Sequence, residues 1–334
     1  MRTTAESVGF RGPSFPMETF EMRTRLLPLL VCCGALAITA AAQAQGNSQT
    51  EYLEVQSGPP MLGIHWTRDF QPNARAAEEA KEARAARPNK SPNMTYHGGV
   101  IMPTQNTKAI FWGTSWGSYT GDKITGMDSW YTGFSNSNYA KTNTEYTGSN
   151  GQVGPMSNYG GHVIDTSAST SGGNTSTILA EVCKEITNPD PSGNGYYAVY
   201  TDTPRGSARY CAWHSVGTCN GVRVQFAYFF KLDGDAGCDP QDTSGKHSQG
   251  LAAIANVSGH ELSEAMTDPA SPGAWYDSQG AENGDKCAWT FGAPLVTFSN
   301  GTQWKIQGEW SNAAYNAGTG YPNNSGQKGC LSGQ

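Results

Sequence analysis

Residues 248–268 read SQGLAAIANVSGHELSEAMTD, and this stretch decides the expected fold. Apolar residues recur along one side of it, at Leu251, Ile254, Ala255, Leu262 and Met266. This spacing is the period of an amphipathic helix, which we predict over about residues 248–266. The helix carries His-Glu-x-x-Glu at residues 260–264, where a zinc protease usually has His-Glu-x-x-His. Three interpretations follow: a hydrolytic site, a metal site with another purpose, or an exposed helix turn with ordinary surface charges.

Strand and helix patterns surround this helix on both sides. We expect strands at 97–103 (HGGVIMP), 107–113 (TKAIFWG), 160–167 (GGHVIDTS), 195–202 (GYYAVYTD) and 222–230 (VRVQFAYFF), helices at 123–134 and 174–186, and a hairpin over 294–310 that turns at 299–301. The predicted fold class is therefore α+β: one domain with a mixed central β-sheet and packed helices, a zincin-like HExxE helix, and disulfides that stabilise it.

The amino-terminal part of the chain differs from the rest. A basic tetrapeptide and an apolar run precede Ala42-Gln-Ala44, which fits a signal-peptidase site. We therefore interpret residues 1–44 as a signal peptide with an upstream extension. Residues 45–92 are rich in Ala, Glu and Arg and lack an apolar stripe, so they are predicted to be a linker or pro-segment. Residues 93–334 form the predicted globular domain of a secreted protein, extracellular or periplasmic.

Charge and hydropathy exclude two classes of partner. The whole chain carries a formal charge of −6, and removing residues 1–44 takes away four Arg and three Glu, which leaves −7. An acidic chain lacks the basic surface of a nucleic-acid-binding protein. No later stretch approaches the roughly 20 apolar residues that span a bilayer, so no membrane partner is expected after signal cleavage.

Six cysteines remain after that cleavage: Cys183, Cys211, Cys219, Cys238, Cys287 and Cys330. An even number in an exported chain predicts about three disulfides. The sequence leaves their pairing open. Cys211 and Cys219 close a short loop and are the first pair that we would expect.

The His-Glu-x-x-Glu spacing favours a metal ion over a surface helix turn. Positions four apart lie on one helix face, so His260 and Glu264 point the same way and are both competent zinc ligands. Glu261 occupies the position from which the Glu of HExxH proteins activates water, and is the candidate catalytic residue. The surrounding helix is largely apolar, where an unpaired Glu would cost several kcal/mol and a cation would remove that cost.

A tight site needs at least a third protein ligand. The acidic stretch GAENGDKC supplies Glu282 and Asp285 as candidates. Asp277 is a weaker choice, and His214 or His247 would also qualify if the fold brings either one close. Zinc is the expected ion, and calcium is the alternative if oxygen atoms alone coordinate it.

Two further residues are candidates for substrate binding. Trp275 lies between turn residues beside the acidic stretch, and its ring is suited to stacking on a ligand, although most aromatic residues serve core packing. His97, in TYHGGV, is either a substrate contact or a histidine that fixes the start of a strand.

Several motifs in order resemble one known family. They are YHGG at 96–99, FWGTSW, YCAWH at 210–214, GHELSEAMTDPASPGAWY, AENGDKC, WKIQGEW and the final Cys330. With these motifs the chain resembles the secreted phosphate-induced protein family, typified by the plant EXORDIUM protein, and its bacterial relatives. The resemblance covers almost the whole globular domain. Asn283 stands where the family usually has Ile, and the family's Gly-rich tract is reduced to AWTFGAPL.

The resemblance implies an extracellular, wall-associated protein and adds weight to a divalent metal. The family's motifs fall here on His260, Glu261, Glu264, Thr267, Asp268 and Pro269, followed by Glu282, Asp285 and Cys287. Our first hypothesis is a secreted, peptidase-like zinc hydrolase. The second is a non-catalytic extracellular protein that binds a cell-wall polysaccharide or another partner and holds a structural ion.

Overall fold

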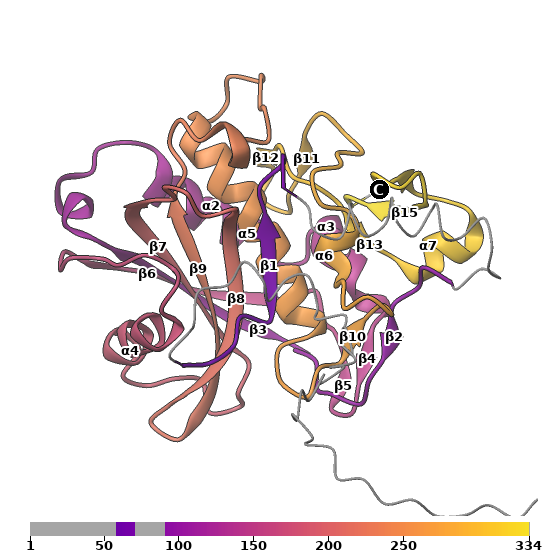
Figure 1. Cartoon of the computed structure of the whole chain (residues 1–334), viewed down its shortest axis with the longest axis horizontal. Coiled ribbons are helices and arrows are strands. Elements are labelled where there is room, and N and C mark those ends of the chain that lie inside the picture. The colour runs from indigo at the N-terminus through magenta and orange to yellow at the C-terminus, as the bar shows by residue number, and fades with distance from the viewer. Residues whose placement is uncertain (1–57, 71–90, 334) are drawn as a thin grey trace, which may run out of the picture. The chain divides into compact units, whose positions relative to one another are not determined.

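The computed structural model describes residues 58–70 and 91–333, and the predicted signal peptide lies outside these ranges. A mixed six-stranded sheet is the centre of the fold, in the order β1-β8-β9-β7-β3-β6 (Figure 1). Its strands are β1 (Gly63–Trp66), β3 (Gln105–Trp112), β6 (Ser157–Asp165), β7 (Gly195–Pro204), β8 (Tyr210–Cys219) and β9 (Val222–Lys231). The sheet and its packed helices confirm the predicted fold class.

The remaining elements are short, apart from three helices. The α-helices are α2 (Lys123–Phe134), α3 (Asn138–Lys141), α4 (Thr175–Glu185), α5 (Gln249–Thr267), α6 (Asn283–Lys286) and α7 (Asn312–Ala317), and the 3₁₀ helices are η2 (Thr114–Ser118), η3 (Thr142–Glu145) and η4 (Ala236–Cys238). The paired short strands are β2 (Thr95–Tyr96) with β10 (Trp275–Tyr276), β4 (Thr147–Gly148) with β5 (Gly151–Gln152), β11 (Val296–Thr297) with β12 (Gln303–Trp304), and β13 (Glu309–Trp310) and β14 (Tyr321–Pro322) with β15 (Lys328–Leu331).

Strand directions divide the sheet into two parts. β7, β3, β6 and β9 run parallel where they are neighbours, whereas β8 is antiparallel to both β9 and β1. The parallel strands are buried, aromatic and β-branched, as strands covered on both faces are. β1 has a single neighbour and therefore forms the edge of the sheet.

Side-chain alternation along β8 places helices on opposite faces of the sheet. A Cβ atom on Gly217 would meet Leu179 of α4, and Trp213 shares that face because it is four residues away. His214 points to the other face, where it meets Glu264 of α5. β8 therefore presents a histidine to the helix that carries the His-Glu-x-x-Glu motif.

Helix α5 is buried along nearly its whole length. Ser248 caps its start, since the side-chain oxygen accepts a hydrogen bond of 3.1 Å from the Leu251 backbone N–H. Every residue from 250 to 267 is buried, including both glutamates of the motif. The motif therefore lies in the core, and the interpretation as an exposed helix turn is wrong.

The other predicted elements fare differently. The helices at 123–134 and 174–186 and the strands at 107–113, 195–202 and 222–230 are present within one or two residues at most ends. The predicted strand 97–103 is absent, because its backbone bonds to the turn after α5 rather than to a sheet. The 294–310 hairpin exists only as β11 and β12 around the turn, since β13 pairs with β15.

Part of the predicted linker or pro-segment lies in the sheet. Within it, residues 63–66 form β1, which pairs with β8 from Gly63 opposite His214 to Trp66 opposite Tyr210. Ile64, His65 and Trp66 are buried. None of the helices in the described ranges combines the length and the apolar character that a bilayer span requires.

Three disulfides join all six predicted cysteines: Cys183–Cys219, Cys211–Cys238 and Cys287–Cys330. Our expected pair Cys211–Cys219 is wrong. Both residues lie on β8, where eight steps of extended chain separate them by roughly 26 Å, and a disulfide requires Cα atoms within about 7 Å. Disulfides persist in oxidising compartments, which suggests an extracellular protein.

We expect the loss of the Cys287–Cys330 bridge to cost stability through the unfolded chain. The bridge closes a loop of 43 residues, so its removal should lower the free energy of unfolding by about 4 kcal/mol. The double variant Cys287→Ser/Cys330→Ser is compared with the native chain by urea unfolding. Cys183→Ser/Cys219→Ser, with a loop of 36 residues, is the matched control and should lose nearly as much. A loss below about 1 kcal/mol would contradict the loop-closure account.

Candidate metal centre

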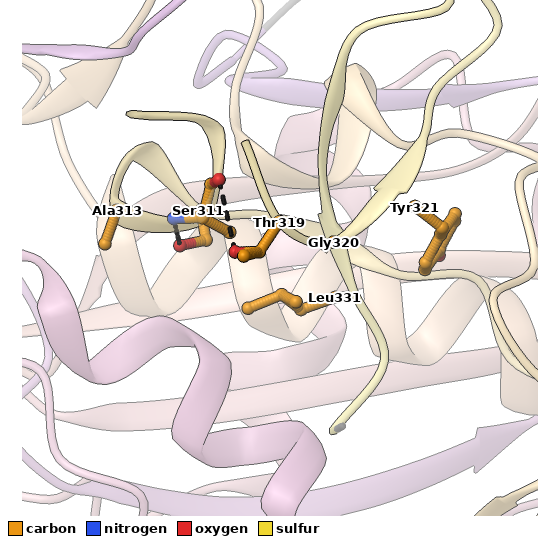
Figure 2. Close-up of a pocket in the computed structure, with 7 residues that line it drawn as sticks. Ser311, Ala313, Thr319, Gly320, Tyr321 and Leu331 are labelled. Atoms are coloured by element: carbon orange, nitrogen blue, oxygen red, sulfur yellow. Dashed lines mark hydrogen bonds between the residues drawn. The ribbon is translucent and has the colours of Figure 1, made fainter. Parts of the chain in front are cut away.

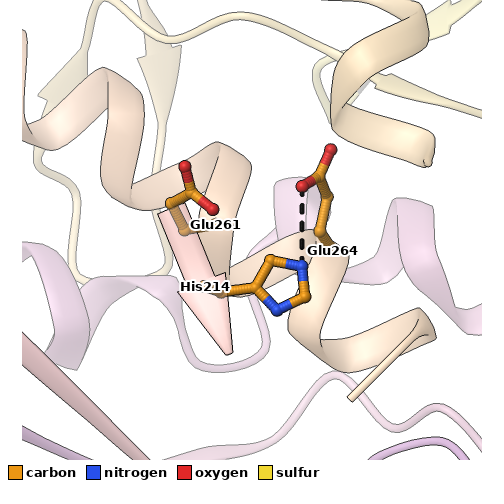
Figure 3. Close-up of side chains that lie close together, drawn as sticks. All are labelled: His214, Glu261 and Glu264. Carbon is orange, nitrogen blue, oxygen red and sulfur yellow. Dashed lines mark ion pairs between the residues drawn. The ribbon is translucent and has the colours of Figure 1, made fainter. Parts of the chain in front are cut away.

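Three side chains from β8 and α5 converge in the core. The ligand atoms of His214, Glu261 and Glu264 lie within 4.8 Å of one another, and all three residues are buried. Figure 3 shows the His214 ring between the two carboxylates, with the ion pair to Glu264 marked. The helix brings the two glutamates together because they are three residues apart, and β8 supplies the histidine from the sheet below.

Several atoms of this group lack hydrogen-bond partners. Both ring nitrogens of His214 are buried and unpaired among the described residues, and so are the Oε2 atoms of Glu261, Glu264 and Glu282. Buried polar atoms are normally satisfied, because each unpaired one costs about 1–3 kcal/mol. Four residues with unpaired atoms around one point indicate a missing partner that contacts all of them, and a cation meets that need.

The spacing of the unpaired atoms fits metal coordination. His214 Nε2 lies 3.6 Å from Glu264 Oε2 and 3.6 Å from Glu282 Oε2. Two ligand atoms each about 2.1 Å from a tetrahedral zinc ion would lie about 3.4 Å apart. The pairs are thus too long for hydrogen bonds and close to the separation that a shared ion imposes.

A second group shares Glu264 and contains the predicted ligands His260 and Asp285. His260 Nε2 lies 3.0 Å from Glu264 Oε1 and 4.0 Å from Asp285 Oδ1. Oε1 of Glu264 also accepts a 3.0 Å hydrogen bond from the Asp285 backbone N–H. Glu264 therefore directs its partnered oxygen toward His260 and its unpaired oxygen toward His214.

Gln307 sets the protonation of His260. Its Oε1 accepts from the Trp289 backbone N–H at 3.2 Å, and its Nε2 donates to the Gly284 carbonyl at 3.1 Å, which fixes the orientation of the amide. The same Nε2 donates to His260 Nδ1 at 3.0 Å. A neutral imidazole that accepts at Nδ1 carries its proton on Nε2. This pattern favours His214 over His260 as the nitrogen ligand.

Burial disfavours charge throughout the centre. It lowers the pKa of His260 to about 3, and burial together with nearby His260 lowers the pKa of His214 to about 3, so both rings are neutral. Burial raises the pKa of Glu264 to about 8. Burial first and Glu264 second raise the pKa of Glu261 and Glu282 well above the usual range. A divalent cation would remove this penalty by favouring the carboxylates.

The acidic stretch after α5 reaches the centre as predicted, through α6. Glu282 contributes the oxygen near His214, and Asp285 accepts a 3.3 Å bond from the Glu282 backbone N–H at the start of α6. Asp277 serves elsewhere, since one of its oxygens accepts from Lys286 and the other from backbone N–H groups. His247 stacks on Trp304 and contacts the Gln303 carbonyl.

The candidate substrate residues lie in an aromatic group on β2 and β10. Trp275 packs against Tyr96 and Tyr146, with ring centroids 5.6 Å and 5.1 Å away, and its Nε1 donates to the Thr147 carbonyl. His97 is exposed and stacks on Tyr276 at 3.6 Å. Their contacts are with each other's strands rather than with the carboxylates of the centre.

Two other features are less suited to chemistry. The acidic group Asp165, Glu181 and Glu185 is neutralised by Lys184, whose ammonium group contacts all three. A surface pocket of about 670 Å³ beside α7 (Figure 2) is lined by small and apolar groups and carries no carboxylate or imidazole. Its lining residues are Ser311, Ala313, Ala314, Thr319, Gly320, Tyr321 and Leu331.

Sequence reasoning ranked His214 only as a residue that the fold might bring close, and missed Gly63 and Gln307. The signal for His214 is a histidine inside the apolar stretch YCAWH, where the only polar ring needs a buried partner. The fold and centre define a disulfide-bonded α+β protein with a buried His/Glu group that could hold a metal ion. Comparisons with protein-family models, with curated proteins and with solved structures found no match to this chain.

Proposed function

We propose that this chain is a secreted metalloprotein that holds one divalent ion, zinc, between His214, Glu264 and Glu282. The single observation behind it is the set of unpaired, buried ligand atoms 3.6 Å apart. One imidazole nitrogen with carboxylate oxygens suits zinc better than calcium, which prefers oxygen ligands alone. The disulfides support export to an oxidising compartment.

We further propose that the centre hydrolyses peptide-like bonds. The ion would supply Lewis-acid catalysis. Glu261 lies within 4.8 Å of the His214 and Glu264 ligand atoms, and its Oε2 is unpaired, so it is positioned to take a proton from an attacking water. The neutral His214 ring and the Glu264 and Glu282 carboxylates would hold the ion. His260 would orient Glu264 through the 3.0 Å contact at Oε1.

The choice between the two histidines gives the first test. His214→Ala should reduce bound zinc from one equivalent to below about 0.1, because it removes the nitrogen ligand. His260→Ala, in the same core and with the same loss of an imidazole, is the matched control and should keep most of the metal. Inductively coupled plasma mass spectrometry of the purified mature proteins measures both. Native protein without stoichiometric metal, or the reverse order of the two variants, contradicts the proposal.

A second candidate function is a non-catalytic extracellular binding protein with a structural ion. The observation that favours it is the complete burial of the centre, since His214, Glu261 and Glu264 have no exposed surface. Removal of the metal by a chelator would then lower the thermal stability, and no form of the protein would hydrolyse labelled casein. The peptidase proposal requires a form in which the centre opens.

The family resemblance remains a proposal and bears on partners. Membership of the phosphate-induced protein family would place the chain at a cell wall, with a peptide or a wall polysaccharide as its ligand. The aromatic group around Trp275 and His97 is the surface suited to stacking on sugar rings. Binding to soluble wall glycans, compared between the native protein and Trp275→Ala, tests this partner.

A further inference from the structure

The edge strand β1 crosses the metal centre. It runs antiparallel to β8 with Gly63 opposite His214, the residue that offers the nitrogen ligand. Backbone hydrogen bonds of 2.9 Å bracket the strand, from the Leu62 N–H to the His214 carbonyl and from the Thr67 N–H to the Arg209 carbonyl. Figure 1 shows β1, in indigo, beside β8 and against α5. Contacts between β1 and the centre are therefore contacts of the backbone of an added strand.

These contacts reach the reactive groups themselves. The His65 backbone N–H donates to Glu261 Oε1 at 3.2 Å, so the proposed base is engaged by β1. A Cβ atom on Gly63 would lie 2.1 Å from Glu264 Oε2 and 2.4 Å from His214 Nε2. The backbone of residue 63 thus lies directly over the two proposed ligand atoms, and only glycine can occupy that position.

The strand comes from a different part of the chain than the domain that it covers. It belongs to residues 58–70, separated in sequence by residues 71–90 from the domain that begins at 91. Side-chain hydroxyls hold its start, since Ser215 and Thr175 donate to the carbonyls of Pro60 and Pro59 at 2.6 Å and 2.5 Å. Its end is held where Trp289 Nε1 donates to the Trp66 carbonyl at 2.9 Å.

We propose that β1 is an inhibitory strand that occupies the place of an extended polypeptide substrate. Without it, β8 would be a long exposed edge beside the metal centre, and an exposed edge recruits an extended peptide by backbone hydrogen bonding. The substrate class is accordingly a polypeptide that pairs antiparallel with β8 and places a small residue opposite His214. This inference rests on the proposed function and adds its regulation and substrate class.

The alternative occupant of this edge is a permanent structural strand. Ile64 and Trp66 are buried on the other side of β1, as a permanent strand would bury them. The difference is experimental: an inhibitory strand leaves and returns while the rest stays folded, whereas a structural strand leaves only when the whole domain unfolds.

The experiment cuts the connection in the folded, full-length mature protein. A recognition sequence for a site-specific protease is inserted between Phe70 and Ser91, and a scrambled insert is the control. Cutting removes the high effective concentration of β1, so dilution should release it by a factor of about 10² or more. Three readouts follow: circular dichroism for folding, the rate of zinc transfer to a chelator, and hydrolysis of fluorescein-labelled casein.

The expected result is a folded protein that loses zinc to the chelator about tenfold faster and hydrolyses casein, because the backbone cover is gone. A synthetic peptide of residues 58–70 should reverse both changes, and the same peptide with Gly63→Ala should not. Activity equal in the uncut and cut proteins overturns the inference but leaves the hydrolase. Unfolding upon release, or a fragment that cannot be displaced below global unfolding, also overturns it.

Failure of the proposed function has a separate outcome. If the cut protein binds the native peptide reversibly and exposes its zinc yet cleaves no casein, the displaceable strand is supported and the hydrolytic role is lost. If the uncut protein holds no zinc, the metal centre itself is wrong.

Discussion

Glu264→Ala is expected to yield a protein without stoichiometric zinc and without hydrolytic activity. Glu264 is the residue common to both buried groups, with Oε1 toward His260 and Oε2 toward His214. Its removal takes away one proposed ligand and leaves the His214 ring without its closest acidic neighbour. We expect the affinity for zinc to fall by at least about 100-fold, which exceeds the effect of losing an outer contact.

Glu261→Gln is the matched comparison, because it changes a neighbouring glutamate of the same helix and keeps its size. The amide cannot take a proton from water, so activity of the cut protein should fall by about 10²–10⁴-fold. Zinc content should stay near one equivalent. Metal analysis and casein hydrolysis on both variants decide the roles. If Glu261→Gln loses its zinc, Glu261 is a ligand rather than a base, and the catalytic assignment is wrong.

Local periodicity predicted the parts of the fold that depend on neighbouring residues. The helix was expected over about 248–266 and spans Gln249–Thr267, because its apolar spacing is long and regular. The acidic stretch at Glu282 reached the centre as predicted, since only a short connection separates it from α5. These features require no knowledge of distant segments.

Features that depend on pairing between distant segments were missed. β8 was not expected as a strand, so the alternation that directs His214 toward α5 was not visible, and the pair Cys211–Cys219 was proposed in error. Gln307 is 47 residues from His260, and no local pattern connects them. Gly63 lies in a segment that composition assigned to a linker or pro-segment. Register sets these contacts, and register is a tertiary property.

Gly63→Ala is the second change with a large expected effect. The added methyl carbon would lie 2.1 Å from Glu264 Oε2 and 2.4 Å from His214 Nε2, well inside van der Waals contact. Either β1 lifts away from β8 or the two ligand side chains turn aside. Overpacking of a buried site should lower the free energy of unfolding by about 1–3 kcal/mol. We also expect weaker zinc binding in the uncut protein.

Gly160→Ala is the control, because it adds the same methyl group to a strand of the same sheet. Its nearest neighbour, the Thr107 carbonyl oxygen, would be 3.6 Å away, which is ordinary contact. Urea unfolding and competition with a zinc chelator measure both variants. Equal stability and zinc affinity for Gly63→Ala and the native protein would contradict the position of β1 over the centre.

The cut protein extends this comparison to the role of β1. If β1 is an inhibitory strand, Gly63→Ala weakens zinc binding only while the strand is in place, because the clash leaves with it. The variant should therefore match the native protein in zinc affinity once the strand has been released. The uncut variant should also show hydrolytic activity that the uncut native protein lacks, since a lifted β1 opens the edge of β8. A penalty in zinc affinity that persists after release would mean that residue 63 acts on the centre through the fold rather than by covering it.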